Sequence, residues 1–122
     1  LEIKILQRAR KKGIVVLHIC KDQIRLPMYA GYPADMVNWA IHDCKYDLAA
    51  GRKLFPDATL LGGFDDRSGL VLDGNMDQIA QAAQKLVDQI GRERFIFGAD
   101  CTLPTELSYH RIHDVIEQVR RT

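Results

Sequence analysis

The chain has 122 residues, of which 47% are hydrophobic, and its 17 Lys and Arg against 16 Asp and Glu give a net charge of +1. This size supports one domain with a real core, and the near balance of charge excludes a strong electrostatic attraction to nucleic acid or to a membrane surface. No apolar run approaches the ~18 residues that a membrane span requires.

Glycine and proline divide the chain into segments of alternating helical and strand character. In chain order we expect a helix at 1–12, a strand at 14–20, a short helix within 21–34 broken by Pro27, a strand at 36–41, a helix at 47–55, a strand at 58–64, a loop at 65–74, a helix at 75–91, a strand at 94–99 and a helix from about 108. The helix at 75–91 has the clearest signals, because Asn75 can cap it, Gln78 can answer the cap three residues later, and Gly91 can end it.

Strands that alternate with helices predict a parallel sheet with right-handed crossovers. The strand segments are short and nearly all apolar, which is typical of strands that are covered on both faces. Two architectures fit this order: a flavodoxin-like open sheet, and four β/α units that make half of a (β/α)₈ barrel.

Three residues at strand ends have the chemistry of metal ligands. His18 and Cys20 end the first strand, and a strand period of two directs both side chains to the same face. Cys101 follows the last strand, and the carboxyl ends of parallel strands meet at one edge of the sheet. One imidazole and two thiols suit Zn²⁺, and three protein ligands leave a fourth position open.

The alternative for these residues is structural. Buried cysteines are common and usually inert, and an isolated His-x-Cys is a weak signal. The presence of Cys101 at a second strand end strengthens the metal interpretation. The three cysteines are an odd number without a secretory signal, which predicts thiols in a reducing compartment, the cytoplasm. Because the chain begins at Leu1 rather than Met, we expect a processed protein or a piece excised from a longer one.

The segments "VVLHIC", "ADMVNWA", "ATLLGGFDDR" and "RFIFGADCTLPTELSYHRIHDVIEQVR" together resemble the C-terminal half of the uroporphyrinogen decarboxylase superfamily. The resemblance implies that residues 1–122 are one fragment, the C-terminal half of a TIM (β/α)₈ barrel whose N-terminal half is missing. The superfamily includes zinc-dependent methyltransferases that move a methyl group from a corrinoid protein to a thiol or another acceptor. Their His-x-Cys and distant Cys match His18, Cys20 and Cys101.

The decarboxylases of haem synthesis are the other branch, and the chain departs from their pattern. They share a Gly-His-Gly turn after the last strand, whereas this chain has Gly98-Ala99-Asp100-Cys101 there. Their substrate-clamping arginines and aspartate belong to the N-terminal half. The resemblance therefore favours a methyltransferase, with a uroporphyrinogen decarboxylase-type carboxy-lyase as the alternative. A third interpretation is a half-barrel that is catalytically inactive by itself.

Other polar residues near the strand ends receive weaker assignments. Asp100 and Asp65 are the candidate catalytic carboxylates, with Asp100 expected either beside a metal ligand or as a turn carboxylate, and Asp65 expected to face the cavity. The candidates for an exchangeable fourth ligand are Asn38, His42 and Asp43. We further expect an Asp66–Arg67 pair in a solvated loop, backbone access at Gly62-Gly63, a structural Cys44, a core Trp39, and solvent-facing His110 and His113.

The assembly expectation follows from the edges of a half-barrel. The strands at 14–20 and 94–99 would both be apolar edge strands with unpaired backbone groups. A second copy could satisfy them, so we expect a homodimer or a larger homo-oligomer.

Overall fold

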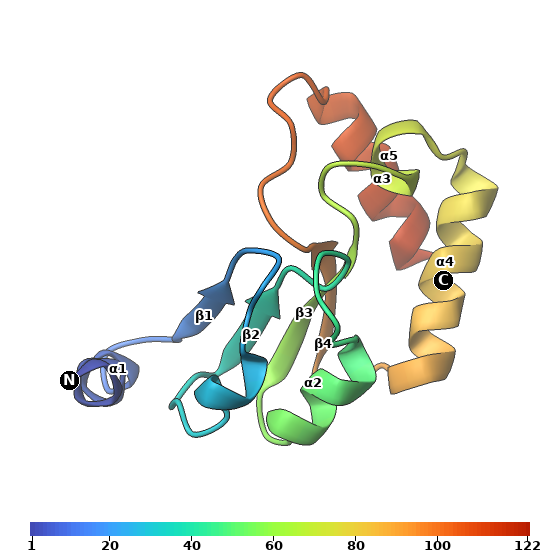
Figure 1. The fold of residues 1–122 in the computed structure, drawn as a ribbon. Coiled ribbons are helices and arrows are strands. Elements are labelled where there is room, and N and C mark those ends of the chain that lie inside the picture. Colours follow the sequence, from blue (N-terminus) through green and yellow to red (C-terminus); the bar gives the residue numbers. More distant parts are fainter.

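Four parallel strands form one sheet, and their order in space, β1-β2-β3-β4, is their order in the chain. The computed structural model describes residues 1–122 (Figure 1). The strands are β1 (Val16–Ile19), β2 (Met36–Trp39), β3 (Thr59–Phe64) and β4 (Phe95–Ala99). A flavodoxin-like sheet reverses its strand order at a switch point, and this sheet does not. The fold is therefore an α/β fold that matches part of a TIM barrel, and the open-sheet alternative is wrong.

Six helical segments accompany the strands, and three of them begin at a residue whose side chain caps the helix. They are α1 (Glu2–Arg10), the 3₁₀ helix η1 (Leu26–Tyr29), α2 (Leu48–Leu54), α3 (Leu70–Asp73), α4 (Met76–Ile90) and α5 (Tyr109–Arg120). The capping box of Asn75 and Gln78 is present at the start of α4, and Gly91 ends that helix. The Ser108 side chain accepts a hydrogen bond from the Arg111 backbone at the start of α5.

Two expected elements differ from the structure. The helix expected within 21–34 is only the four-residue η1, and Pro27 lies in its first turn, where the missing N–H costs nothing. The loop expected at 65–74 contains the short helix α3. Arg111, on α5, stabilises α3 by donating hydrogen bonds to the carbonyls of Leu70, Val71 and Gly74.

The helices cover only one face of the sheet. Leu17, Ile19 and Leu60 pack into the cluster of apolar side chains between the sheet and the helices. On the opposite face, Val16 is 53% exposed and Ile96 is 39% exposed. The expectation that both faces are covered is therefore wrong within this chain. The uncovered face corresponds to the interior of a barrel wall, and this explains why the apolar Val16 and Ile96 are exposed on it.

Both edges of the sheet are open. Helix α1 stands apart beyond the start of β1 and has no buried residue (Figure 1). Its links to the body include the Arg10–Asp35 ion pair and a hydrogen bond from Tyr32 to Glu2. At the other edge an apolar groove of about 430 Å³ runs between β4 and α5. None of the helices is both long and apolar enough to cross a membrane.

Candidate metal centre

The curvature of the sheet brings three ligand-type side chains together at its carboxyl edge. His18 lies in β1, Cys20 follows β1, and Cys101 follows β4. Neighbouring strands are about 4.8 Å apart, so a flat sheet would separate β1 from β4 by about 14 Å. The Cys20 and Cys101 sulfurs are instead 3.3 Å apart. The contact crosses the concave face, as expected for the curved wall of a barrel.

The spacing of these atoms fits a tetrahedral metal site. The ligand atoms of His18, Cys20 and Cys101 all lie within 4.8 Å of one another, and Cys101 Sγ is 3.5 Å from His18 Nε2. Zinc bonds of about 2.3 Å to sulfur and about 2.0 Å to nitrogen give tetrahedral edges of about 3.8 Å between sulfurs and about 3.5 Å between sulfur and nitrogen. The donor set, two thiols and one imidazole, is one that Zn²⁺ prefers. The three residues therefore fit the ion.

A hydrogen bond with Asn38 fixes the tautomer of the His18 imidazole in which Nε2 is free to bind a metal. The register of β1 and β2 pairs His18 with Asn38. Asn38 is 6% exposed, and its Nδ2 donates to the carbonyls of Leu61 at 2.9 Å and Ala99 at 3.2 Å. Its Oδ1 is therefore the acceptor for His18 Nδ1, which carries the proton. This leaves the lone pair of Nε2 directed at Cys101, as in other sites where the second ring nitrogen fixes the tautomer.

The two thiols share a hydrogen bond that makes them unequal. Either sulfur can be the donor, and the hydrogen bond between them lowers the pKa of Cys101 and raises the pKa of Cys20. The Thr102 backbone N–H also stabilises the Cys101 thiolate. Cys101 is therefore the thiol of the pair that ionises first, and thiolate is the form that binds metals.

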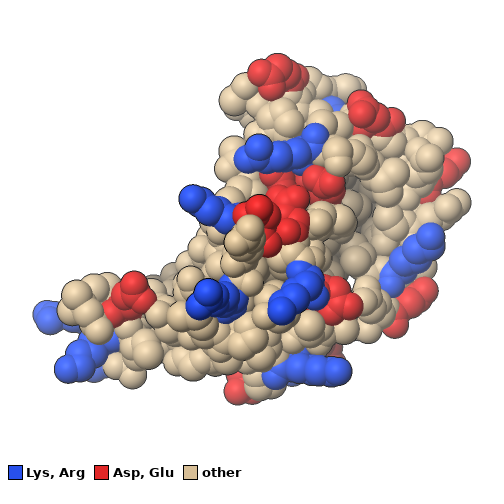
Figure 2. Space-filling view, in the orientation of Figure 1, with Lys and Arg blue, Asp and Glu red and all other residues tan.

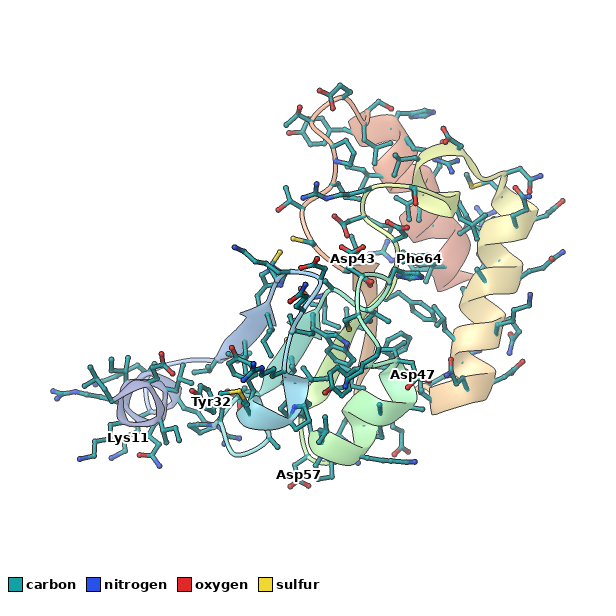
Figure 3. The ribbon with its side chains drawn as sticks, in the orientation of Figure 1. Lys11, Tyr32, Asp43, Asp47, Asp57 and Phe64 are labelled. Carbon is teal, nitrogen blue, oxygen red and sulfur yellow. The ribbon has the colours of Figure 1, made fainter.

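Of the three residues expected to provide a fourth ligand, Asn38 contacts His18, whereas His42 and Asp43 lie elsewhere. Asn38 uses its amide groups in hydrogen bonds, so its assignment as a ligand is wrong. His42 and Asp43 are not in the group of close ligand atoms. Figure 3 shows Asp43 at the carboxyl-terminal edge of the sheet. The structure therefore brings three candidate ligands together, and neither His42 nor Asp43 joins them.

Asp100 positions His42 rather than a member of the cluster. Its side chain is 1% exposed, and Oδ2 accepts hydrogen bonds from the ring Nδ1 of His42 at 2.7 Å and from its backbone N–H at 2.9 Å. Oδ1 accepts from the Gly63 backbone at 3.1 Å. The hydrogen bond with Asp100 raises the pKa of His42, and the charges of Asp65 and Asp43 add to the shift. Asp100 has no hydrogen bond with His18, Cys20 or Cys101. It is a turn carboxylate that binds the imidazole of His42.

The loop after β3 uses its carboxylates locally. Asp65 accepts from the backbone N–H groups of Arg67 and Ser68 and from the Ser68 hydroxyl. Asp66 and Arg67 pair at 3.5 Å, but the Asp66 side chain is only 5% exposed, so the expectation that it is solvated is wrong. The Oδ2 of Asp66 is buried and has no hydrogen-bond partner. On the side of the molecule that Figure 2 draws, acidic side chains gather near the centre.

The remaining residues lie mostly where the sequence places them. Trp39 is fully buried, and its indole N–H donates to the Tyr46 carbonyl. Cys44 is half-buried, packs against the apolar core and has only local backbone groups as hydrogen-bond partners, and burial raises its pKa. His110 and His113 are exposed. In the Gly62-Gly63 pair, the backbone N–H of Gly63 donates a hydrogen bond to Asp100.

Sequence reasoning did not identify the supporting roles of Asn38 and Asp100. Both roles depend on contacts between residues 20 to 61 positions apart in the chain. The only signal in the sequence is the presence of polar side chains at the ends of otherwise apolar strands.

Comparisons with known proteins give a family and a fold. The family model described as uroporphyrinogen decarboxylase (URO-D) matches residues 2–122. Among solved structures, the chain is similar to a methyltransferase from Methanosarcina mazei, with a TM-score of 0.69 and 17% sequence identity. The match covers 98% of this chain and 35% of the methyltransferase chain, so this chain spans about a third of that structure's length. The comparison with curated proteins gives no match.

Proposed function

The chain belongs to the uroporphyrinogen decarboxylase (URO-D) family, and we propose that it is the C-terminal half of a barrel enzyme that transfers a methyl group at a zinc site. The observation that carries this proposal is the convergence of the ligand atoms of His18, Cys20 and Cys101 within 4.8 Å. The similarity of the fold to that of a methyltransferase supports it. We propose a corrinoid, carried by a partner protein, as the methyl donor and a thiol as the acceptor.

The chain's own residues would prepare this site. When bound, Zn²⁺ supplies the positive charge that keeps an acceptor thiol in its nucleophilic thiolate form at neutral pH. Asn38 fixes the orientation of His18, and the hydrogen bond between the thiols favours ionisation of Cys101. Cys20 lines an open cavity of about 450 Å³, in which two basic residues, Lys21 and Arg25, outnumber one acidic residue, Asp22. We propose that the acceptor approaches through this cavity, where the basic residues suit an acceptor that also carries a negative charge.

The alternative is a decarboxylase of tetrapyrrole synthesis, after which the family is named. Those relatives need no metal, and this chain has Gly98-Ala99-Asp100-Cys101 where they have a Gly-His-Gly turn. A second alternative is that the half-barrel is inactive by itself. Coproporphyrinogen formed from uroporphyrinogen by this chain alone would favour the decarboxylase, and we expect none.

Elemental analysis of the purified chain tests the metal assignment. We expect up to one Zn²⁺ per chain after refolding with zinc, and loss of that zinc in Cys20→Ser and Cys101→Ser. Cys44→Ser is the matched control, because it removes the third thiol without touching the cluster. Negligible zinc in the wild type would overturn the proposal, and so would equal loss in all three variants.

Co²⁺ substitution tests the binding of an acceptor thiol. Cobalt in a site with cysteine ligands gives sulfur-to-metal charge-transfer absorption in the near ultraviolet. Added 2-mercaptoethanol should increase that absorption in the wild type, because the three protein ligands leave a position open. An unchanged spectrum at saturating thiol would contradict the acceptor role, even if the metal is bound.

A further inference from the structure

The contact between Cys20 and Cys101 has a second chemical consequence besides metal binding. Their sulfurs are 3.3 Å apart, which is closer than the tetrahedral edge of about 3.8 Å between two sulfurs on zinc. A disulfide bond needs sulfurs about 2.05 Å apart, so the pair lies within about 1.3 Å of bonding distance. The same pair comprises two of the three candidate zinc ligands.

The surroundings of the two cysteines allow this movement. Cys20 is exposed and lies outside β1, and the next residue, Lys21, has a φ of 105°, in the left-handed region that favours glycine. Cys101 begins the irregular segment between β4 and α5. Neither sulfur is therefore fixed by regular secondary structure. Cys44, by comparison, has only local backbone partners and no contact with another cysteine.

We propose that Cys20 and Cys101 are an oxidation site, and that hydrogen peroxide or another peroxide converts them to a reversible disulfide that switches the metal site off. One cysteine, as thiolate, attacks the peroxide O–O bond and becomes a sulfenic acid, while the departing oxygen leaves as water. The second sulfur then attacks the sulfenic sulfur, the S–S bond forms, and a second water leaves. The two thiols are oxidised, one H₂O₂ is reduced, and both thiol protons end in water.

The disulfide would remove both thiolates from the metal at once. His18 alone then remains of the three ligands, and a single imidazole does not retain Zn²⁺ against competing chelators. The disulfide would also link the two edge strands of the sheet across its concave face. A dithiol would reverse the oxidation. The switching effect depends on the proposed zinc site, whereas the formation of the disulfide does not.

Peroxide treatment of the zinc-refolded chain tests the inference. We expect the count of free thiols to fall from three to one, the mass to decrease by two hydrogen atoms, and a peptide map to join Cys20 to Cys101. Bound zinc should be released to a chromophoric chelator in the same time course, and dithiothreitol with fresh zinc should restore both. Cys44→Ser should behave as the wild type, whereas Cys20→Ser should form no intramolecular disulfide and should accumulate oxygen adducts on Cys101.

The outcomes separate this inference from the proposed function. Zinc that is bound and retained while all three thiols survive peroxide would overturn the oxidation site and leave the zinc proposal intact. A Cys20–Cys101 disulfide in a chain that never binds zinc would support the oxidation site and overturn the zinc proposal. A disulfide that involves Cys44 would overturn the pairing inferred from the 3.3 Å contact.

Discussion

Substitution of Asn38 by Ala should weaken zinc binding without removing a metal ligand. The Oδ1 of Asn38 accepts the Nδ1 proton of His18 and so keeps Nε2 free for the metal. Loss of such a supporting partner typically reduces metal affinity 10- to 100-fold. This corresponds to about 1.4–2.7 kcal/mol of binding free energy.

The same substitution also has a structural cost, which must be separated from the effect on binding. The Nδ2 of Asn38 donates to the partly buried carbonyls of Leu61 and Ala99, and each lost hydrogen bond costs about 1 kcal/mol of stability. Asn75→Ala is the matched control, because it removes the cap of α4, costs about 1 kcal/mol, and lies outside the metal cluster.

Competition with a chromophoric chelator gives the zinc dissociation constant of each variant, and urea unfolding gives its stability. We expect Asn38→Ala to bind zinc 10- to 100-fold more weakly and Asn75→Ala to bind as the wild type. A dissociation constant for folded Asn38→Ala within about twofold of the wild type would refute the orienting role. Equal weakening in both variants would attribute the effect to stability alone.

Three further predictions concern protonation, packing and assembly. Asp100 raises the folded-state pKa of His42, so the resulting stabilisation is complete below the ordinary pKa of 6.5 and is lost as the pH rises through the raised pKa. When the pH is raised from about 6 to about 8, the urea concentration at the unfolding midpoint should therefore decrease more in the wild type than in His42→Gln. Parallel pH profiles of the two proteins would contradict this prediction. Gly51→Ala should lower the unfolding free energy by about 1–3 kcal/mol, because the added Cβ would lie 2.1 Å from the Trp39 ring. This steric cost should exceed the helix preference of Ala. A variant that is more stable than the wild type in thermal unfolding would show that the ring can move. Sedimentation at micromolar concentration should show a dimer or larger oligomer, because both edge strands and the apolar groove beside β4 are open, and a clean monomer throughout that range would rule out the pairing.

The elements of this fold can be read from local patterns because local interactions determine them. Asn75 and Gln78 are three residues apart, and that spacing alone specifies the capping box. The period of two along β1 likewise places His18 and Cys20 on one face. Helix α3 was missed because its carbonyls are satisfied by Arg111, about 40 positions later in the chain.

The candidate site could be predicted only in part. The parallel order of the strands is enough to predict that Cys101 lies at the same edge of the sheet as His18 and Cys20. The role of Asn38 depends on the register between β1 and β2, which a single sequence does not determine. The burial of Asp66 and the pairing of Asp100 with His42 depend in the same way on contacts that form only in the folded chain.

X-ray absorption at the zinc K-edge tests the central claim most directly, because it reports the atoms bound to the metal. For the zinc-refolded wild type we expect two sulfur neighbours at about 2.3 Å and at least one nitrogen at about 2.0–2.1 Å. Cys101→Ser should lose one of the two sulfur neighbours, and Cys44→Ser should keep both. A wild-type spectrum with only oxygen and nitrogen neighbours would contradict the assignment of Cys20 and Cys101 as zinc ligands.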